Sequence, residues 1–395
     1  MGTFEMKYDF DKLTNRFDSQ SYKWDVGKNE LPMWVADMDF ETAPEIREAL
    51  AQRVNHGVFG YNVVPDEWYD AYIGWWKKRH NTVFNKDWLL FCTGVVPAIS
   101  SMVRKLTCVG ENVLIQTPVY NIFFNSILNN GRNVVESPLV YENGEYRVDF
   151  DDLEKKLADP QTSLMILCNP HNPVGRIWSC EELAKIGELC NKHHVTVISD
   201  EIHCDLTDPG FEYVPFISAS EKCAAVCATC VAPTKTFSIP GIQTAAIVVP
   251  DPFLRHKVWR GINTDEVAEP NNFATVAAVA AFTKGEAWLD ELRIYLAENK
   301  KLVREFIGCN IPGVKVVPSE ATYLLWLDCS AITDDAEVLV KFIRKTTGLF
   351  LTEGIEYGAP GKKFIRMNVA CPRARVEDGL LRLKTAVEKY ESSKC

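Results

Sequence analysis

The sequence predicts an α/β fold: a mostly parallel seven-stranded sheet sandwiched by helices, followed by a smaller α+β domain. Seven apolar, strand-like segments alternate with helical patterns up to about residue 270, and this alternation is typical of a doubly wound parallel sheet. A long helical pattern at 287–307 then leads into a second set of strands. We therefore expect an N-terminal arm over 1–45 that joins the small domain, a large domain over 46–285 and a small C-terminal domain over 286–395.

The strands of the large domain are expected where apolar runs end at turn-forming residues. They cover 88–92, 112–116, 134–138, 164–168, 196–199, 224–231 and 244–249. A helix is expected over 97–106, because apolar side chains recur there at helical spacing behind a proline.

The small domain shows fewer and shorter patterns. Its strands are expected near 314–317, 323–327 and 364–368. Apolar residues at helical spacing predict a final helix over 375–390. Arg373 and Arg375, at the start of this helix, are interpreted as solvated charges.

The composition describes an ordinary globular protein that is large enough for two cores, with 395 residues, 47% of them hydrophobic and 24% charged. A net charge of −10 without a basic cluster argues against a nucleic-acid partner. The longest apolar stretch, 273–282, is too short to span a bilayer, and the N-terminus lacks the apolar segment of a signal peptide. Thirteen scattered cysteines favour reduced thiols and a cytoplasmic location.

Cys223, Cys227 and Cys230 have a spacing that can ligate an iron–sulfur cluster. The residues between them form an apolar strand-like run, however, and such a strand points alternate side chains to opposite faces. No fourth ligand for zinc lies nearby in the sequence. We therefore expect no metal ligands in this chain.

Lys235 is the first candidate for a catalytic residue. It follows the apolar run 224–232 and is surrounded by small residues, with a glycine at position 241. Such a setting can hold a lysine in a partly dry pocket, where desolvation lowers its pKa and frees the amine to attack a carbonyl. Most lysines are solvated surface charges, so this residue gains weight only from two segments that precede it.

Asn172 and Asp200 lie in these two segments. Two Asn-Pro pairs in 169–175 exclude a helix there and predict a loop at the carboxyl end of a strand, where α/β sheets place ligand sites. Asp200 and His203 end the next buried strand, and a buried carboxylate needs a cation or strong donors. The alternatives are an ordinary proline-rich turn, a helix N-cap for Asp200 and a satisfied core histidine for His203.

Taken in order, these segments resemble the pyridoxal phosphate enzymes of the aspartate aminotransferase family, which have fold type I. The order of Asn172, Asp200, Lys235 and a C-terminal arginine, Arg366, is the order of that family. Motifs such as Pro-Met-Trp-Val-Ala-Asp-Met-Asp-Phe, beginning at residue 32, are similar to those of its cystathionine β-lyase branch, the C–S lyases. The resemblance covers nearly the whole chain and implies pyridoxal 5'-phosphate as the cofactor.

The resemblance also implies a role for each candidate residue around the cofactor ring. Lys235 would form the Schiff base and, once displaced by substrate, remove the α-proton. Asp200 would pair with the pyridine nitrogen and keep it protonated. Asn172 and His203 would face the phenolic oxygen of the ring, and Tyr120 would stack on its face. The alternative for Tyr120 is a core tyrosine.

The phosphate of the cofactor is expected at the backbone of Gly94, Val95 and Val96, because free N–H groups at the start of a helix suit an anion. Thr234 resembles a hydroxyl position that also bonds the phosphate. The chain departs from the family at Ala232 and Gln243, where relatives commonly carry a serine and an arginine. Tyr61 of the partner subunit would then contribute to phosphate binding, which implies a homodimer.

The substrate would be held by Arg366, whose guanidinium suits the bidentate recognition of an α-carboxylate. The alternative is a surface arginine on an edge strand. Asn172 and Ala36 would lie close to the same carboxylate.

The function implied is a pyridoxal phosphate-dependent carbon–sulfur β-lyase. It would cleave L-cystathionine or other S-substituted cysteines to a thiol, pyruvate and ammonia. One alternative is an aminotransferase with the same cofactor and residues. The other is a catalytically idle relative with a regulatory or binding role, which the presence of Lys235 and Asp200 disfavours.

Overall fold

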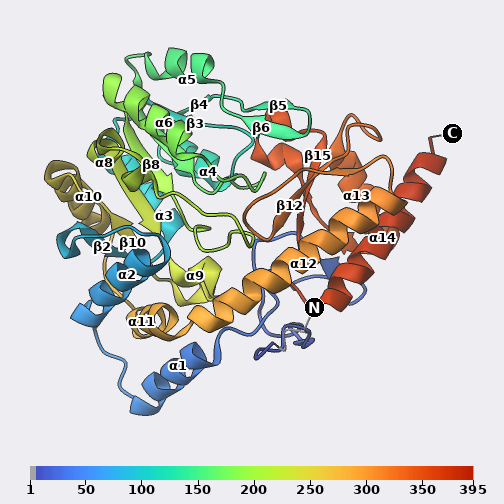
Figure 1. The fold of residues 1–395 in the computed structure, drawn as a ribbon, viewed down its shortest axis with the longest axis horizontal. Coiled ribbons are helices and arrows are strands. Elements are labelled where there is room, and N and C mark those ends of the chain that lie inside the picture. The colour runs from blue at the N-terminus through green and yellow to red at the C-terminus, as the bar shows by residue number, and fades with distance from the viewer. Residues whose placement is uncertain (1–5, 395) are drawn as a thin grey trace.

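The computed structural model describes residues 6–394, and its larger part is built on a seven-stranded sheet (Figure 1). The strand order is β2-β10-β9-β8-β7-β3-β4, and only β10 runs antiparallel to its neighbours. The bounds are β2 Leu89–Cys92, β3 Asn112–Ile115, β4 Asn133–Glu136, β7 Thr162–Cys168, β8 Thr196–Asp200, β9 Cys227–Val231 and β10 Ala245–Val248. The predicted mostly parallel seven-stranded sheet is confirmed.

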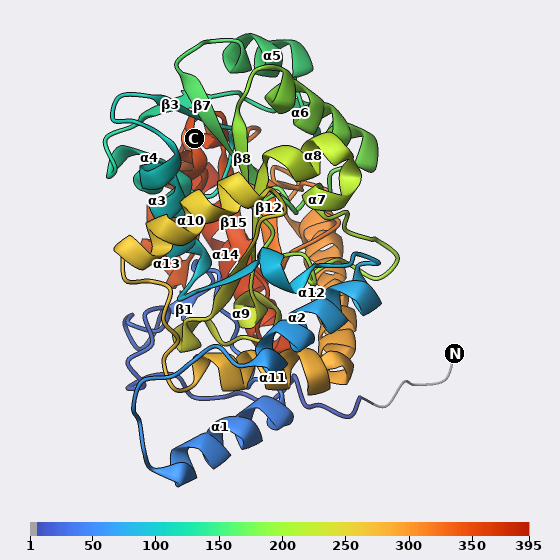
Figure 2. The same cartoon turned by 90° about the vertical axis from the view of Figure 1, so that its left-hand side faces the viewer.

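Helices cover both faces of this sheet, because its strands are apolar on both sides. Along β8, Val197 packs into one core and Ile198 into the other. Helices α3, α4 and α10 cover one face, and α2, α6, α8 and α11 contribute to the other (Figure 2). The bounds are α2 Asp66–Arg79, α3 Val95–Leu106, α4 Ile122–Leu128, α6 Cys180–Lys192, α8 Glu221–Val226, α10 Pro252–Thr264 and α11 Ala274–Lys284.

A second, antiparallel sheet of four strands lies in the C-terminal part, in the order β11-β12-β15-β14. Its core includes side chains of three helices, α12, α13 and α14. The bounds are β11 Lys315–Val316, β12 Leu324–Asp328, β14 Thr352–Glu353, β15 Phe364–Asn368, α12 Glu286–Asn310, α13 Ala336–Thr347 and α14 Arg373–Ser392.

The remaining α-helices and strands are short or lie outside the two sheets. They are α1 Pro44–His56, α5 Phe150–Leu157, α7 Phe216–Ala219, α9 Pro233–Thr236, the hairpin β5 Val140–Glu142 with β6 Glu145–Arg147, and the pair β1 Leu31–Pro32 with β13 Leu349–Phe350. Along residues 6–394, no helix combines the length and the apolar character needed to cross a membrane.

The N-terminal segment runs along the C-terminal part of the molecule (Figure 1). The backbone N–H of Tyr8 donates to Glu291 of α12 at 2.9 Å, and Arg375 of α14 donates to the carbonyl of Thr14 at 2.8 Å. β1 then pairs in parallel with β13. Each of these contacts joins segments that lie more than 280 residues apart in the sequence.

The expected strand at 224–231 begins later than predicted. Ser220 caps a helix there, accepting a hydrogen bond from the backbone N–H of Cys223 at 3.1 Å, so that 221–226 is helical. Cys223 therefore lies in α8, while Cys227 and Cys230 lie in β9 and pack into opposite cores. The predicted helix at 97–106 begins two residues earlier, at Val95.

Candidate active site

A cavity of about 270 Å³ lies at the carboxyl ends of strands β2, β7, β8 and β9. This is the edge where open α/β sheets bind ligands. Ten of the predicted site residues line it: Ala36, Gly94, Val95, Val96, Tyr120, Asn172, Asp200, His203, Thr234 and Lys235. Segments far apart in the sequence thus meet at one place.

Lys235 points into this cavity from α9, the short helical turn after β9. Its Nζ donates to the backbone carbonyl of Ala36 at 2.5 Å. Burial lowers the pKa of the amine to about 8, and Arg366 acts in the same direction, while Asp37 and Asp200 oppose the shift. At pH 7 about a tenth of the amine is therefore unprotonated and can act as a nucleophile or base.

Asp200 is the last residue of β8 and is buried at the cavity wall. One carboxylate oxygen accepts the backbone N–H of Ile202 at 3.2 Å. Burial raises the pKa of Asp200 to about 6, although that hydrogen bond and the charge of Lys235 oppose the shift. A buried carboxylate in this state favours a cationic partner inside the cavity.

Asn172 and Arg366 connect the large sheet with the small one. Arg366, buried in β15, donates to Asn172 Oδ1 at 3.3 Å and to the carbonyl of Trp34 at 2.9 Å. Its guanidinium also lies over the ring of Tyr357, 4.9 Å from the centroid. Arg366 is therefore held beside the cavity rather than exposed at a sheet edge, and among the described residues its Nε has no hydrogen-bond partner.

His203 and Tyr120 line the cavity with side chains that are uncharged near neutral pH. Burial lowers the pKa of His203 to about 3, aided by Lys235 and Arg366. Within residues 6–394 its Nδ1 is buried without a hydrogen-bond partner. Burial raises the pKa of Tyr120 to about 12. His203 thus offers an unused ring nitrogen to a polar ligand.

The helix α3 presents its N-terminus to the cavity, with Gly94 at the cap. The first backbone N–H groups of a helix have no intrahelical partner and suit an anion. Thr234 lies on the same cavity, and so do three residues that the sequence did not single out as ligands: Thr93, Gln243 and Thr244. Of the three, Gln243 holds the position at which relatives commonly carry an arginine, and the threonine directly before Gly94 was visible in the sequence.

Tyr61 does not reach this cavity within its own chain. It lies in the segment between α1 and α2 and is fully exposed, at 101% of its reference surface. Val58, Phe59 and Val63 on the same segment are also exposed. The assignment of Tyr61 to a neighbouring subunit therefore stays a prediction.

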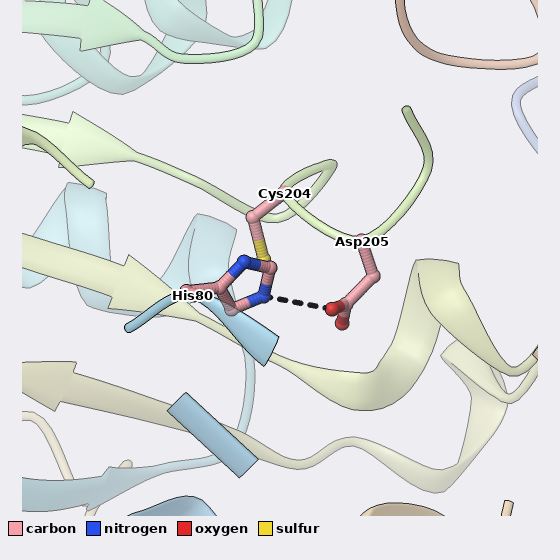
Figure 3. A group of neighbouring side chains, drawn as sticks. All are labelled: His80, Cys204 and Asp205. Atoms are coloured by element: carbon pink, nitrogen blue, oxygen red, sulfur yellow. Dashed lines mark hydrogen bonds and ion pairs between the residues drawn. The ribbon is translucent and has the colours of Figure 1, made fainter. Parts of the chain in front are cut away.

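A buried carboxylate, Asp205, supports the turn that carries Lys235, and it lies beside His80 and Cys204 (Figure 3). Asp205 accepts hydrogen bonds from Thr236 at 3.0 Å, from Trp75 Nε1 at 3.0 Å and from His80 Nε2 at 2.9 Å. Asp205, His80 and Cys204 have the donor types and spacing of metal ligands. Because three donors already occupy this carboxylate, the cluster is explained without an ion, and we assign it as a support for α9.

Two further residues of the site were missed from the sequence. Asp37 influences the Lys235 amine through its charge, and Tyr323 donates to the same Ala36 carbonyl at 3.2 Å. Both act on the lysine from the wall opposite the large sheet. Their roles depend on contacts between distant segments, and no local motif marks them.

The fold and the cavity define an enzyme of the α/β class that presents a lysine and an acid to one ligand site, with an arginine held beside it. The chain belongs to the aminotransferase class I and II family, whose model matches residues 28–383.

Individual relatives cover almost all of the chain. It is 44% identical over 385 residues to cystathionine beta-lyase PatB of Bacillus subtilis, an alignment that spans 96% of this chain and 99% of the relative. The PLP-bound C–S lyase of Staphylococcus hominis superposes with a TM-score of 0.91 at 34% identity, covering 98% of this chain and 100% of the other. A PLP-bound putative aminotransferase from Clostridium difficile gives 0.93 at 38% identity, covering 96% and 100%.

Proposed function

We propose that this protein is a pyridoxal phosphate-dependent carbon–sulfur β-lyase that acts on L-cystathionine or other S-substituted cysteines. The observation that carries the proposal is the convergence of Lys235, Asp200 and Arg366 around one cavity, in a chain 44% identical to a cystathionine β-lyase over nearly its full length. The overall reaction consumes one water and yields a thiol, pyruvate and ammonia.

The cavity fits pyridoxal 5'-phosphate on the chemistry of its donors. Asp200 is a buried carboxylate with a raised pKa, which a protonated pyridine nitrogen would compensate. The free N–H groups at the start of α3, together with Thr234, would hold the phosphate. Two side chains would face the phenolic oxygen. One is His203, whose Nδ1 is buried and has no hydrogen-bond partner among the described residues, and the other is the amide of Asn172.

The cofactor supplies an aldehyde that condenses with amines and a ring that withdraws electrons from the substrate Cα. Arg366 would bind the substrate α-carboxylate and fix the direction of the Cα–H bond. The Lys235 amine would take that proton, for which a pKa of about 8 is well matched. Asp200 would keep the charge on the ring nitrogen during this step.

A homodimer is part of the proposal. The exposed segment 58–63 carries several apolar side chains next to Tyr61, and a second copy of this chain would cover them. Tyr61 of the partner subunit would then complete the phosphate site where Gln243 stands in place of an arginine. The scattered thiols, twelve of them free within residues 6–394, support a cytoplasmic location.

The same residues also serve an aminotransferase, so the experiment must separate the two reactions. Purified holoenzyme is incubated with L-cystathionine without any keto acid, and pyruvate, ammonia and free thiol are measured. A lyase releases all three in equal amounts with many turnovers. Turnover that stops after one equivalent and resumes only when a keto acid is added would establish the aminotransferase instead.

A further inference from the structure

A cluster of charged side chains with a buried centre lies behind the loop that faces Lys235. It consists of Arg16, Lys23, Asp37, Asp39 and Arg375, and we refer to it as the arm–loop cluster. We propose that Lys23 is a positioning residue, which acts through this cluster to hold the loop 34–39 in the place where it receives the Lys235 amine.

Lys23 and Asp39 form the centre of the arm–loop cluster. Their side chains are each only 1% exposed and lie 3.1 Å apart. Asp39 also accepts a hydrogen bond from Trp24 Nε1 at 2.9 Å. Burial opposes ionisation of Asp39, but Lys23, Trp24 and the two arginines outweigh it and hold the pKa of Asp39 below its usual value. A buried pair of this kind is costly to break by removing one partner.

Two arginines extend the cluster to the N-terminal arm and to the C-terminal helix. Arg16 binds Asp39 at 2.9 Å and Asp37 at 2.7 Å. Arg375 of α14 lies 3.1 Å from Asp39, with 14% of its side chain exposed. The interpretation of Arg375 as a solvated charge was therefore wrong, because α14 begins against the arm and the helix start is covered.

The loop itself is fixed through its backbone. Each carbonyl from Trp34 to Asp37 accepts a hydrogen bond from a side chain: Trp34 from Arg366 and Thr352, Val35 from Asn368, Ala36 from Lys235 and Tyr323, and Asp37 from Asn368 and Lys23. Lys23 therefore donates a hydrogen bond directly to the Asp37 carbonyl, the last of this series, at 3.0 Å. It also contributes through Asp39, whose backbone N–H donates to Ala370 at 2.9 Å.

The position of the loop determines what surrounds the catalytic amine. Ala36 accepts the amine, Asp37 favours its charged form, Arg366 disfavours it, and Asp200 favours it from the large sheet. Burial has the largest influence on the amine and lowers its pKa. If the loop shifted within a cavity that stayed closed to water, this influence would remain, while the amine would lose both an acceptor and an anion. The charged form of Lys235 would then become less favourable.

The test uses the full chain freed of cofactor and the substitution Lys23→Met, which keeps the length and removes the charge. Modification of Lys235 by trinitrobenzenesulfonate, a reagent for uncharged amines, is followed against pH by peptide mass spectrometry. The wild-type midpoint is expected near pH 8. Loss of positioning moves the midpoint down by about 0.5–1 pH unit. In the holoenzyme, we expect kcat to fall by about tenfold.

The direction of the shift separates positioning from simple charge. If Lys23 acted only as a nearby positive charge, its removal would stabilise the protonated amine and move the midpoint upward. An upward shift or no shift in folded Lys23→Met would overturn the proposal. Lys12→Met is the matched control, because Lys12 lies on the same arm in an exposed ion pair with Glu41 at 2.6 Å; its midpoint is expected to equal that of the wild type.

Lys23→Arg provides a second variant if Lys23→Met does not fold. Arginine keeps the charge but cannot place a single ammonium between Asp39 and the Asp37 carbonyl, so a downward shift is again expected and an unchanged midpoint contradicts the proposal. The inference rests on the proposed role of Lys235. The labelling experiment needs no substrate, however, so it distinguishes a failure of positioning from a wrong assignment of the reaction.

Discussion

The two walls of the active-site cavity are built in different ways. The sheet wall carries Asn172, Asp200 and Lys235 at or just after the ends of neighbouring strands, so the backbone of the sheet sets their positions. The arm wall consists of the loop 34–39 with Arg366, and side-chain hydrogen bonds to backbone carbonyls set its position. The proposed chemistry is therefore concentrated on a wall that the sheet backbone positions, while alignment depends on a wall that side-chain hydrogen bonds hold in place.

This comparison predicts that substitutions on the sheet wall abolish the reaction, whereas those on the arm wall change its alignment. The largest effect is expected for Lys235→Ala. Loss of the amine should lower kcat by about 10³-fold or more and remove the visible absorbance of the lysine-bound cofactor, measured by spectrophotometry. Retained absorbance with near-normal turnover would show that another amine does this work.

Asp200→Asn is expected to have the next largest effect. The amide has nearly the same shape but cannot pair as an anion with a protonated ring nitrogen, so kcat should fall by about 10²- to 10³-fold. The folded protein should remain intact, because burial already raises the pKa of this carboxyl to about 6 and disfavours its charge. Steady-state kinetics measure the loss of kcat, and thermal unfolding measures whether the fold stays intact. Unchanged kcat would remove Asp200 from the chemistry.

Arg366→Lys tests the arm wall. Lysine keeps the charge but cannot bind Trp34 O and a substrate carboxylate with one planar group. We expect KM to rise by about 10- to 100-fold with a smaller change in kcat, determined from initial rates over a range of substrate concentrations. A lower kcat with an unchanged KM would instead indicate that Arg366 acts in the chemical step rather than in substrate binding.

Asp205→Asn tests how much the buried Asp205 carboxylate stabilises α9, the turn of the sheet wall that carries Lys235. Asparagine offers one oxygen where the carboxylate offers two, so at least one of the hydrogen bonds from Thr236, Trp75 and His80 is lost. The free energy of unfolding should therefore fall by about 1–3 kcal/mol. Denaturant unfolding measures this loss. The control is Asp66→Asn, which affects an exposed pair with Lys86 and one acid in the first turn of α2, and it should change the free energy of unfolding much less than Asp205→Asn.

The smallest effect is expected for Tyr61→Phe, which keeps the ring and removes one hydroxyl. If this hydroxyl serves the phosphate of the neighbouring subunit, cofactor affinity should fall by about 5- to 20-fold, as measured by fluorescence titration of the cofactor-free protein. An unchanged dissociation constant would leave Gln243, Thr93 and Thr244 as the side chains that compensate for the missing arginine.

The same contrast explains what the sequence could predict. Asn172, Asp200 and Lys235 sit in local motifs after apolar strands, so their segments could be located from the sequence, while their meeting point was implied by the resemblance to the family. Asp37, Tyr323 and Asp205 act through contacts between segments far apart in the chain, and no periodicity or motif marks such contacts. The strand at 224–231 was predicted too long, because Ser220 caps a helix whose apolar residues resemble those of a strand.

The route of the N-terminal segment has a practical consequence for anyone who shortens the chain. A version that started at residue 25 would lack Arg16 and Lys23 and would leave the Asp39 carboxylate facing Arg375 alone. Such a trimmed protein would keep both sheets and every residue that faces the cofactor, and it would still be a poor enzyme.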